Sequence, residues 1–267
     1  MNIRPFIHAA LILASVPLTA CSGDDDSGGG NTGGTGGGGA QSPLAGHTYV
    51  LTTTNSNWTK PRGIAKDVEN VMPHFLFQVT SAGGNNVKVL MSVAPKVKDA
   101  DGKVLEDMIT QDPCSPTHEF SSSGIAAQLG PEDLKLHLVN TVKLEDPNDD
   151  LSVTAMVKGL EFKNIFPADG KAWTADQIAN EDYPGELNAT MDFRELAPLF
   201  NVLYHPDGAP PTPKEICDQL PDTASCADCG DGSITCLSAQ ASLLHAEDHP
   251  GLTVTPVTEA SRPATCK

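Results

Sequence analysis

Apolar and polar side chains alternate along residues 134–144, LKLHLVNTVKL, and this alternation constrains the fold more than any other feature of the chain. Leucine or valine recurs on one parity, beginning with Leu134, Leu136 and Leu138, while the other parity starts with Lys135 and His137. A side-chain period of two is the repeat of a β-strand that buries one face and exposes the other. The segment therefore predicts a long strand beside an apolar core.

Other segments show the same alternation or a short apolar, β-branched run. We expect strands at residues 47–53, 74–80, 87–94, 151–162 and 187–193. The loop SAGGNN between the second and third of these is rich in Gly and Asn, as hairpin loops are. The apolar parity of the fourth changes at Gly159, which predicts a bulge or a bend in that strand.

Helical patterns are few and short. Residues 174–180, TADQIAN, begin with Thr174 and carry Gln177 three positions later, which is the pattern of a capping box. Residues 213–220 open with proline, as many helices do. In the run RELAPLF we expect Pro198 to break any helix, because proline removes a backbone hydrogen bond and clashes with the preceding turn.

Strands joined by short connections pair with their neighbours as an antiparallel meander. The expected fold class is therefore mainly β, with the meander forming a barrel, a half-barrel or a sandwich, three forms that alternation alone does not distinguish. A proline-rich segment, HPDGAPPTP, lies near residue 206. It divides the folded part into an antiparallel β domain, 43–205, and a small disulfide-rich C-terminal region with short helices, 206–267, packed on that domain.

The first 20 residues have the character of a signal peptide. Arg4 precedes an apolar stretch from Phe6 to Val16, which is shorter than a membrane-spanning helix. Residues 18–21, Leu-Thr-Ala-Cys, resemble the lipobox of bacterial lipoproteins. The resemblance implies cleavage before Cys21 and attachment of diacylglycerol and a further fatty acid such as palmitate to that residue. Several acyl chains together anchor a protein firmly to a membrane.

Residues 21–42 follow as the lipidated cysteine and a Gly-rich segment with almost no apolar side chains. Such a composition predicts a flexible tether with a reach of roughly 25 Å. In the lipoprotein family, a serine directly after the cysteine, here Ser22, is associated with transfer to the outer membrane. The expected location is therefore the cell envelope, lipid-anchored in the outer membrane and facing either the periplasm or the outside.

The remaining cysteines all lie in the folded part. They are Cys114, Cys217, Cys226, Cys229, Cys236 and Cys266. An even number of cysteines in an exported chain indicates up to three disulfides, for which fifteen pairings exist. Bridges would stabilise a C-terminal region that is too small for a large core. Cys266, next to the last residue, is expected to hold the C-terminus against the body of the protein.

Two motifs have spacings that other proteins use for metal or redox chemistry. Cys226 and Cys229 form a Cys-x-x-Cys pair, but no βαβ pattern accompanies it, and exported thiols oxidise readily. His245 and His249 would share one face of a helix and could chelate a metal, yet Pro250 follows at once. A solvated helix end is the expected role of these histidines. We therefore expect structural disulfides, and neither a metal nor another cofactor.

The charge balance excludes one class of partner. The chain carries 17 Lys and Arg residues against 34 Asp and Glu residues, a net charge of −17. A protein this acidic is repelled by phosphate backbones, so nucleic acid is not an expected partner. The same charge keeps a domain soluble at a cell surface.

Catalytic signatures of acyl-transfer and nucleotide-binding enzymes do not occur in the sequence. A hydrolase hypothesis combines His118 with one of the serines 121–123, although closeness along a chain is weak support for a triad. Trp58 and Trp173 could stack on a sugar ring, but packing in the core or at its rim is their expected role. The preferred interpretation is a non-enzymatic protein.

One long stretch resembles a pattern in exported Cys-containing lipoproteins of myxobacteria and their relatives. It runs from LSVTAMVKGLEFKNIFPADGKAW through YPGELNATMDFRELAPLF to the cysteines at 217–236. A strand leads to a turn at Asp169 and Gly170, a second strand begins at Gly185 and ends near Asp192, and a Cys-rich module follows. That group has no assigned function, so the resemblance implies export and disulfides alone.

Two non-enzymatic functions are preferred over the hydrolase. Long strands with one apolar face can enclose a hydrophobic ligand, and a lipid anchor suits a lipid cargo. The expected function is therefore an outer-membrane-anchored, non-enzymatic lipoprotein that binds a lipid or another hydrophobic ligand. The alternative is a structural or protein-interaction module of the cell envelope, in which the same side chains form an ordinary core.

Overall fold

The computed structural model describes residues 44–54, 56–61, 65–83, 86–99, 103–105, 107–123, 128–140, 151–170, 172–204, 212–220 and 225–266. All of these residues belong to one unit of the chain, Gly38–Lys267. The expected signal peptide, the lipidation residue Cys21 and the Gly-rich tether lie outside the described residues.

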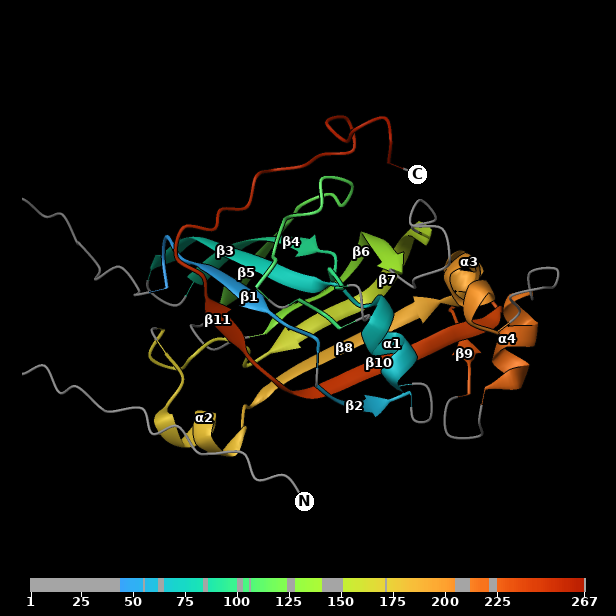
Figure 1. The fold of residues 1–267 in the computed structure, drawn as a ribbon, viewed down its shortest axis with the longest axis horizontal. Helices are drawn as coiled ribbons and strands as arrows, with labels where there is room; N and C mark the ends of the chain where they lie inside the picture. The colour runs from blue at the N-terminus through green and yellow to red at the C-terminus, as the bar shows by residue number, and fades with distance from the viewer. Residues whose placement is uncertain are drawn as a thin grey trace, which may run out of the picture. The chain divides into compact units, whose positions relative to one another are not determined.

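Two antiparallel sheets make up the protein (Figure 1). One contains β1 (Thr48–Leu51), β3 (His74–Gly83), β4 (Asn86–Ala94), β5 (His118–Ser123) and β11 (Ala246–Asp248). The other contains β2 (Asn57–Lys60), β6 (Leu129–Asn140), β7 (Leu151–Lys163), β8 (Gly185–Asp192), β9 (Ala227–Asp228) and β10 (Ile234–Leu244). The strand orders are β11-β1-β3-β4-β5 and β2-β10-β8-β7-β6, with β9 paired to β10. The expected mainly β, antiparallel class is confirmed, and the sheets are not closed into a barrel.

The inner faces of the two sheets pack against each other. Phe75 and Phe77 of β3 meet Phe162 of β7 edge to face, with ring centroids 4.9 and 5.1 Å apart. Leu134 and Leu136 of β6, on the apolar parity of the alternating segment, are buried in the same cluster. Residues 141–144, the end of that segment, lie outside the described residues. The alternation thus predicted correctly which side chains of β6 face the core.

The parity change in β7 is a bulge, as predicted. Gly159 adopts a left-handed φ of 57°, and the register between β7 and β8 shifts between Lys158 and Glu161. A glycine is favoured in that conformation because it has no Cβ. The bulge turns both parts of β7 toward the same core, since Val157 and Leu160 are both buried.

Two of the helices follow their capping signals. The helices α2 (Ala175–Asn180) and α4 (Pro213–Gln219) begin after Thr174 and Thr212, each with a complete capping box. The break expected at Pro198 is wrong, because α3 (Phe193–Tyr204) continues through it. Burial of a helical face that includes Phe193, Leu196 and Leu199 outweighs the lost hydrogen bond. The helix α1 (Ala65–Val71) was not anticipated.

Three disulfides are present, and they select one of the fifteen pairings: Cys114–Cys266, Cys217–Cys226 and Cys229–Cys236. The two cysteines of the Cys-x-x-Cys motif therefore bond to different partners. The Cys-rich segment 206–267 also supplies β10, which lies inside the second sheet between β2 and β8. This segment therefore contributes a central strand of the second sheet to the fold, in addition to a short helix and the disulfides.

The end of the chain is held along the outer face of the first sheet. Val254 packs in a small apolar cluster with Val50 and Leu76. The backbone N–H of Thr255 donates to the side chain of Gln111, whose amide donates in return to the Thr255 carbonyl, both over 2.7 Å. The Cys114–Cys266 bridge completes this attachment, as expected for the last cysteine.

Candidate ligand-binding cleft

A surface cleft of about 410 Å³ lies where α2, the end of β10 and β11 meet. Its lining also includes side chains of the connection after β1 and of the loop at residues 107–109. In Figure 1, α2 is the short yellow helix beside the sheet, and β10 continues into β11. The volume falls in the range of small-molecule sites in proteins.

An aromatic pair forms one wall of the cleft. The rings of Tyr183 and His245 stack with centroids 3.7 Å apart and planes 15° apart. Trp173 meets both rings edge-on, at 5.3 Å from Tyr183 and 6.3 Å from His245, and its Nε1–H donates to the Ala246 carbonyl. This rim packing was the expected role of Trp173, and Trp58 is buried in the core.

The helix α2 positions two further wall residues. Its capping box fixes the start at Thr174, and the chain leaves the helix at Glu181 through a left-handed φ of 51°. This exit directs the chain to Tyr183, two residues later. Ile178, on the last turn, is 55 % exposed and lines the cleft together with Glu181.

Leu243 enters the cleft because the backbone of β10 is distorted. Its φ is 59°, a left-handed value that costs a bulky residue of the order of 1–3 kcal/mol, and the register with β8 shifts between Ser242 and Leu244. The opposing Gly185 makes room for this bulge, since a Cβ there would lie 2.0 Å from the Leu244 carbonyl oxygen. Leu243 is 43 % exposed as a result. Strained backbone of this kind is concentrated at functional sites.

The charge lining the cleft is negative. Asp107, Glu181 and Glu247 contribute carboxylates, and neither lysine nor arginine occurs among the described lining residues. His245 Nε2 lies 2.9 Å from Glu247 Oε1. Burial raises the pKa of the Tyr183 hydroxyl, and the neighbouring Glu247 and Glu181 raise it further.

The short strand β11 is fixed to β1 directly below the cleft. Asp248 pairs in register with Tyr49, and its Oδ2 lies 2.8 Å from His47 Nδ1. Tyr49 is buried and donates its hydroxyl to the Gly170 carbonyl over 3.0 Å. Burial, with Asp248 and then Asp169, raises the pKa of Tyr49 to about 12. These contacts hold Glu247 and His249 in place on either side of Asp248.

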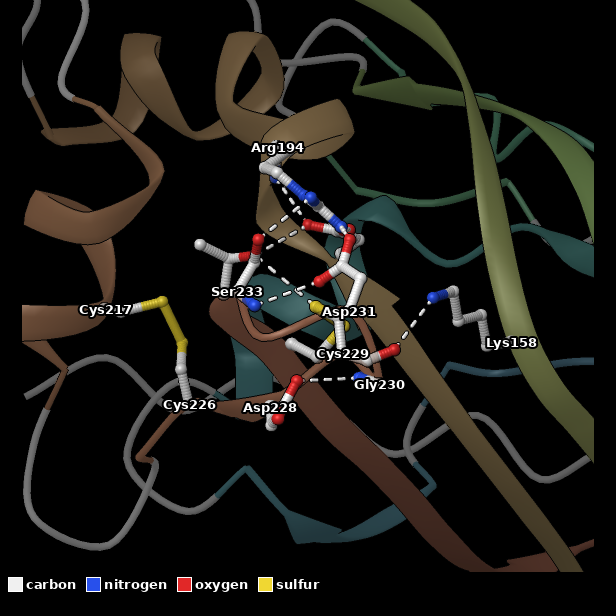
Figure 2. The surroundings of a disulfide bond; sticks show 12 residues. Lys158, Arg194, Cys217, Cys226, Asp228, Cys229, Gly230, Asp231 and Ser233 are labelled. Atoms are coloured by element: carbon white, nitrogen blue, oxygen red, sulfur yellow. Dashed lines mark hydrogen bonds and ion pairs between the residues drawn. A yellow bond between two sulfur atoms is a disulfide. The ribbon is translucent and has the colours of Figure 1, made fainter.

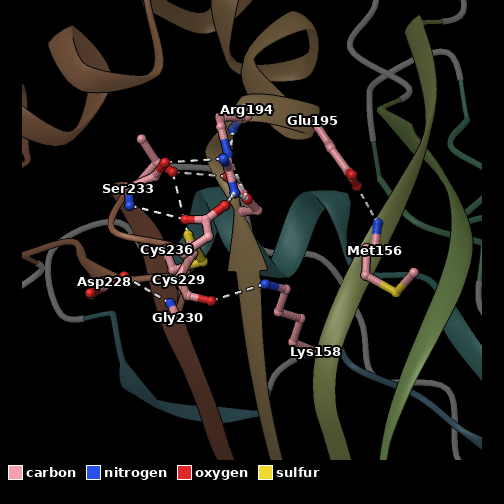
Figure 3. A network of polar contacts seen from close by, with 12 residues as sticks. Met156, Lys158, Arg194, Glu195, Asp228, Cys229, Gly230, Ser233 and Cys236 are labelled. Atoms are coloured by element: carbon pink, nitrogen blue, oxygen red, sulfur yellow. Dashed lines mark hydrogen bonds and ion pairs between the residues drawn. A yellow bond between two sulfur atoms is a disulfide. The ribbon is translucent and has the colours of Figure 1, made fainter.

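A dense polar network surrounds a disulfide at the other end of β10 (Figures 2 and 3). Arg194, at the start of α3, bonds to Asp192, Asp231 and Ser233. The Ser233 backbone N–H and then Arg194 lower the pKa of Asp231 to about 2. Burial alone would raise the pKa of Asp192, but its bonds to Arg194 and Thr235 lower it on balance.

This network fastens the loop of the Cys229–Cys236 bridge to the second sheet. Lys158 of β7 donates to the Cys229 carbonyl over 3.0 Å, as Figure 3 shows. The carboxylate of Asp228 accepts from the backbone N–H groups of Gly230 and Gly232 within the same turn. Arg194 donates to Asp192, Asp231 and Ser233 of the same chain, so the network has a structural role.

The hydrolase candidates do not come together. His118 and Ser122 lie on one strand, β5, about 13 Å apart at the rise of a β-strand. The His118 ring Nε2 lies 3.2 Å from the Lys135 carbonyl oxygen. Phe120, between them, is buried in the core.

The two histidines of the His245–His249 segment do line the cleft, but the expected solvated helix end is wrong. Residues 246–248 are extended as β11, because they pair with β1 at the sheet edge. Among the described residues, two groups could offer three ligand atoms to a metal, Asp112 with Cys114 and His137, and Asp192 with Cys229 and Cys236. Every cysteine in these groups is bonded in a disulfide and offers no thiolate.

Sequence reasoning identified His245 and Trp173 as candidates, but it missed Tyr183, Leu243 and Glu247. The capping box at Thr174 was a usable signal for the place of α2 and hence of Ile178. No local pattern marks the partnership of Tyr183 with His245, because the two rings come from segments far apart in the sequence.

No helix in the described part of the chain has both the length and the apolar character needed to cross a membrane. Comparisons of the chain with protein-family models, with curated proteins and with solved structures find no match.

Proposed function

We propose that the protein is an outer-membrane-anchored lipoprotein that binds a small ligand, without catalysis, in the cleft beside α2. The lipobox-like segment at Cys21 and the Gly-rich residues after it support the anchor. The three disulfides suit an exported chain, because such bonds persist in oxidising compartments.

One observation carries the binding function: exposed apolar side chains gather at the cleft. Among the described residues, four large hydrophobic side chains are exposed, namely Met108, Ile178, Ile234 and Leu243. Ile178 and Leu243 line the cleft, and Met108 lies between the lining residues Asp107 and Ile109. Apolar groups collected in one concave place mark binding sites more often than scattered ones do.

The ligand is expected at this surface cleft rather than between the sheets. Large aromatic side chains of both sheets meet in the interior, and Phe75, Phe77 and Phe162 are fully buried there. A hydrophobic ligand would therefore rest its apolar part on Ile178 and Leu243 and leave its polar part toward the carboxylates. The proposed ligand is therefore a small amphipathic molecule at the surface and not a lipid enclosed between the sheets.

The test is a binding measurement on the purified full-length protein in dodecyl maltoside. Trp173 lies against the aromatic pair, so its fluorescence reports on occupancy of the cleft. A panel of small amphipathic molecules should produce saturable changes that Ile178→Ala weakens. Ile234→Ala is the matched control, because Ile234 is also exposed but does not line the cleft. A panel without any saturable change would favour the structural or protein-interaction module instead.

A further inference from the structure

We infer that the cleft selects a positively charged ligand, an organic ammonium with an apolar substituent. The inference rests on the proposed function and specifies the ligand class for the same site. It follows from three features of the lining: its charge, its arrangement of apolar and polar groups, and the spacing of its carboxylates.

The lining of the cleft is negatively charged. Asp107, Glu181 and Glu247 are three acidic residues around one cleft, with no lysine or arginine among the described lining residues to neutralise them. The chain as a whole carries a net charge of −17. An electrostatic potential of this sign attracts cations and repels anions, and a cleft concentrates it. Burial is the main cause of the raised pKa of Tyr183, and the negative charges of Glu247 and Glu181 raise that pKa further.

The apolar and polar groups of the lining are complementary to such a molecule. Ile109, Ile178 and Leu243 offer a surface to the apolar part. Thr52, Thr54 and Ser56, from the connection after β1, add residues with hydroxyl groups to the lining. A hydroxyl oxygen accepts hydrogen bonds, so such residues suit an ammonium donor.

The spacing of the carboxylates favours an organic cation over a metal ion. No set of three ligand atoms from the described lining residues lies within 4.8 Å of one another, as a metal centre would need. An ammonium group needs hydrogen-bond acceptors and a negative field, which dispersed carboxylates provide. The stacked Tyr183 and His245 add aromatic surface of the kind that attracts cations.

The decisive experiment compares three probes of similar shape by calorimetry on the full-length protein in dodecyl maltoside. The probes are phenethylammonium, its neutral analogue phenethyl alcohol, and the anion phenylacetate. We expect phenethylammonium to bind at least tenfold more tightly than the alcohol, phenylacetate not to bind, and the preference to shrink at high salt. A short capped peptide, Leu-Lys-Leu, tests whether the ammonium group comes from a free amine or from a lysine side chain.

Charge-neutralising variants separate the inference from the proposed function. Glu181→Gln and Glu247→Gln should each weaken phenethylammonium severalfold and weaken phenethyl alcohol less, because glutamine keeps an oxygen acceptor but not the negative charge. Glu132→Gln, an exposed residue of β6 that does not line the cleft, should change neither. Equal affinity for the alcohol and the ammonium, or a preference for phenylacetate, overturns the ligand class while a binding cleft remains. Absence of binding by all three probes and the peptide also overturns the ligand class, and the panel of amphipathic molecules then decides separately whether the cleft binds a ligand at all.

Discussion

Tyr183 and His245 lie in different parts of the chain, yet their rings stack with centroids 3.7 Å apart and form one wall of the cleft. Tyr183 follows α2, and His245 joins β10 to β11. The contact therefore fixes the position of the helix relative to the sheet edge. Trp173, edge-on to both rings, extends it into a cluster of three aromatic side chains.

Removing the Tyr183 ring should loosen this wall. Tyr183→Ala is expected to lower the free energy of unfolding by at least about 1 kcal/mol, because an aromatic pair contributes about that much beyond area burial and the substitution also removes buried area. It should also weaken ligand binding, because α2 is no longer held against β10. Tyr183→Phe keeps the ring and should retain both properties within a small margin. Urea unfolding and calorimetry on the three proteins measure the two effects, and equal binding by Tyr183→Ala would contradict the assigned role.

Leu243 offers a way to separate backbone strain from binding. Its left-handed φ of 59° favours glycine, so Leu243→Gly relieves strain and removes the apolar side chain together. Leu243→Ala removes the side chain but keeps a Cβ in the strained conformation. We expect the glycine variant to be more stable than the alanine variant by about 1 kcal/mol. Both should bind ligand more weakly than the wild type, and a stable glycine variant with unchanged affinity would exclude Leu243 from the site.

Acid should destabilise the protein through His74. This side chain is 1 % exposed, and burial, with Lys96 nearby, lowers its pKa from 6.5 to about 4. The unfolded chain therefore binds a proton that the folded chain does not between pH 6.5 and 4. Stability is expected to fall as the pH falls through this window, by on the order of 3 kcal/mol in total.

Urea unfolding at several pH values measures this loss, and His74→Asn supplies the control. The variant cannot titrate in this range, so its free energy of unfolding should depend less on pH between 6.5 and 4, whatever its stability at pH 7. The same slope in both proteins would show that other groups cause the acid sensitivity.

The sequence allowed the strands with large alternating side chains to be predicted. It missed β10, where the side chains are small, and the shorter strands β2, β5, β9 and β11. In β6, leucine alternates with polar residues, and the strand was evident. In β10, the inward positions include Ala239 and Ala241, which are buried but weakly apolar, and Leu243 interrupts the parity. The pattern there is faint, although the strand lies inside the second sheet.

The cleft was less predictable than the fold because it has no local pattern. Its residues come from several segments, and their meeting depends on β11 pairing with β1 across most of the chain length. The break expected at Pro198 failed for a related reason: burial of Leu196 and Leu199, in a helix that contacts the second sheet, outweighs a local preference. Tertiary packing determined both features.

The lipid anchor has a direct chemical test. Cells expressing the protein and supplied with labelled palmitate should incorporate label into the wild type, because several acyl chains are expected at Cys21. Cys21→Ala should lose the label and the membrane association together. Cys266→Ala is the control, since Cys266 is bonded to Cys114 and is not a lipidation site. Label retained in Cys21→Ala would refute the lipobox interpretation.

The Cys114–Cys266 bridge should stabilise the protein chiefly by restricting the unfolded chain. It closes a loop with a sequence separation of 152 residues, for which the chain-entropy model gives about 5 kcal/mol. The double variant Cys114→Ser, Cys266→Ser should therefore unfold at lower urea concentration. Its C-terminal segment should also become sensitive to proteinase K after about residue 250. What then holds the segment is the packing of Val254 and a few hydrogen bonds, to Gln78, Gln111, Thr117 and Thr154.

The two sheets should remain resistant in this variant, since β10 lies within the second sheet and keeps its own bridge, Cys229–Cys236. The pair Cys217→Ser, Cys226→Ser is the matched control. It closes a loop with a sequence separation of 9 residues, so it should cost less stability and leave the C-terminal segment protected. Mass spectrometry of the proteolytic fragments distinguishes the two results, and a C-terminal segment that resists cleavage in the first variant would show that the bridge is not what holds it.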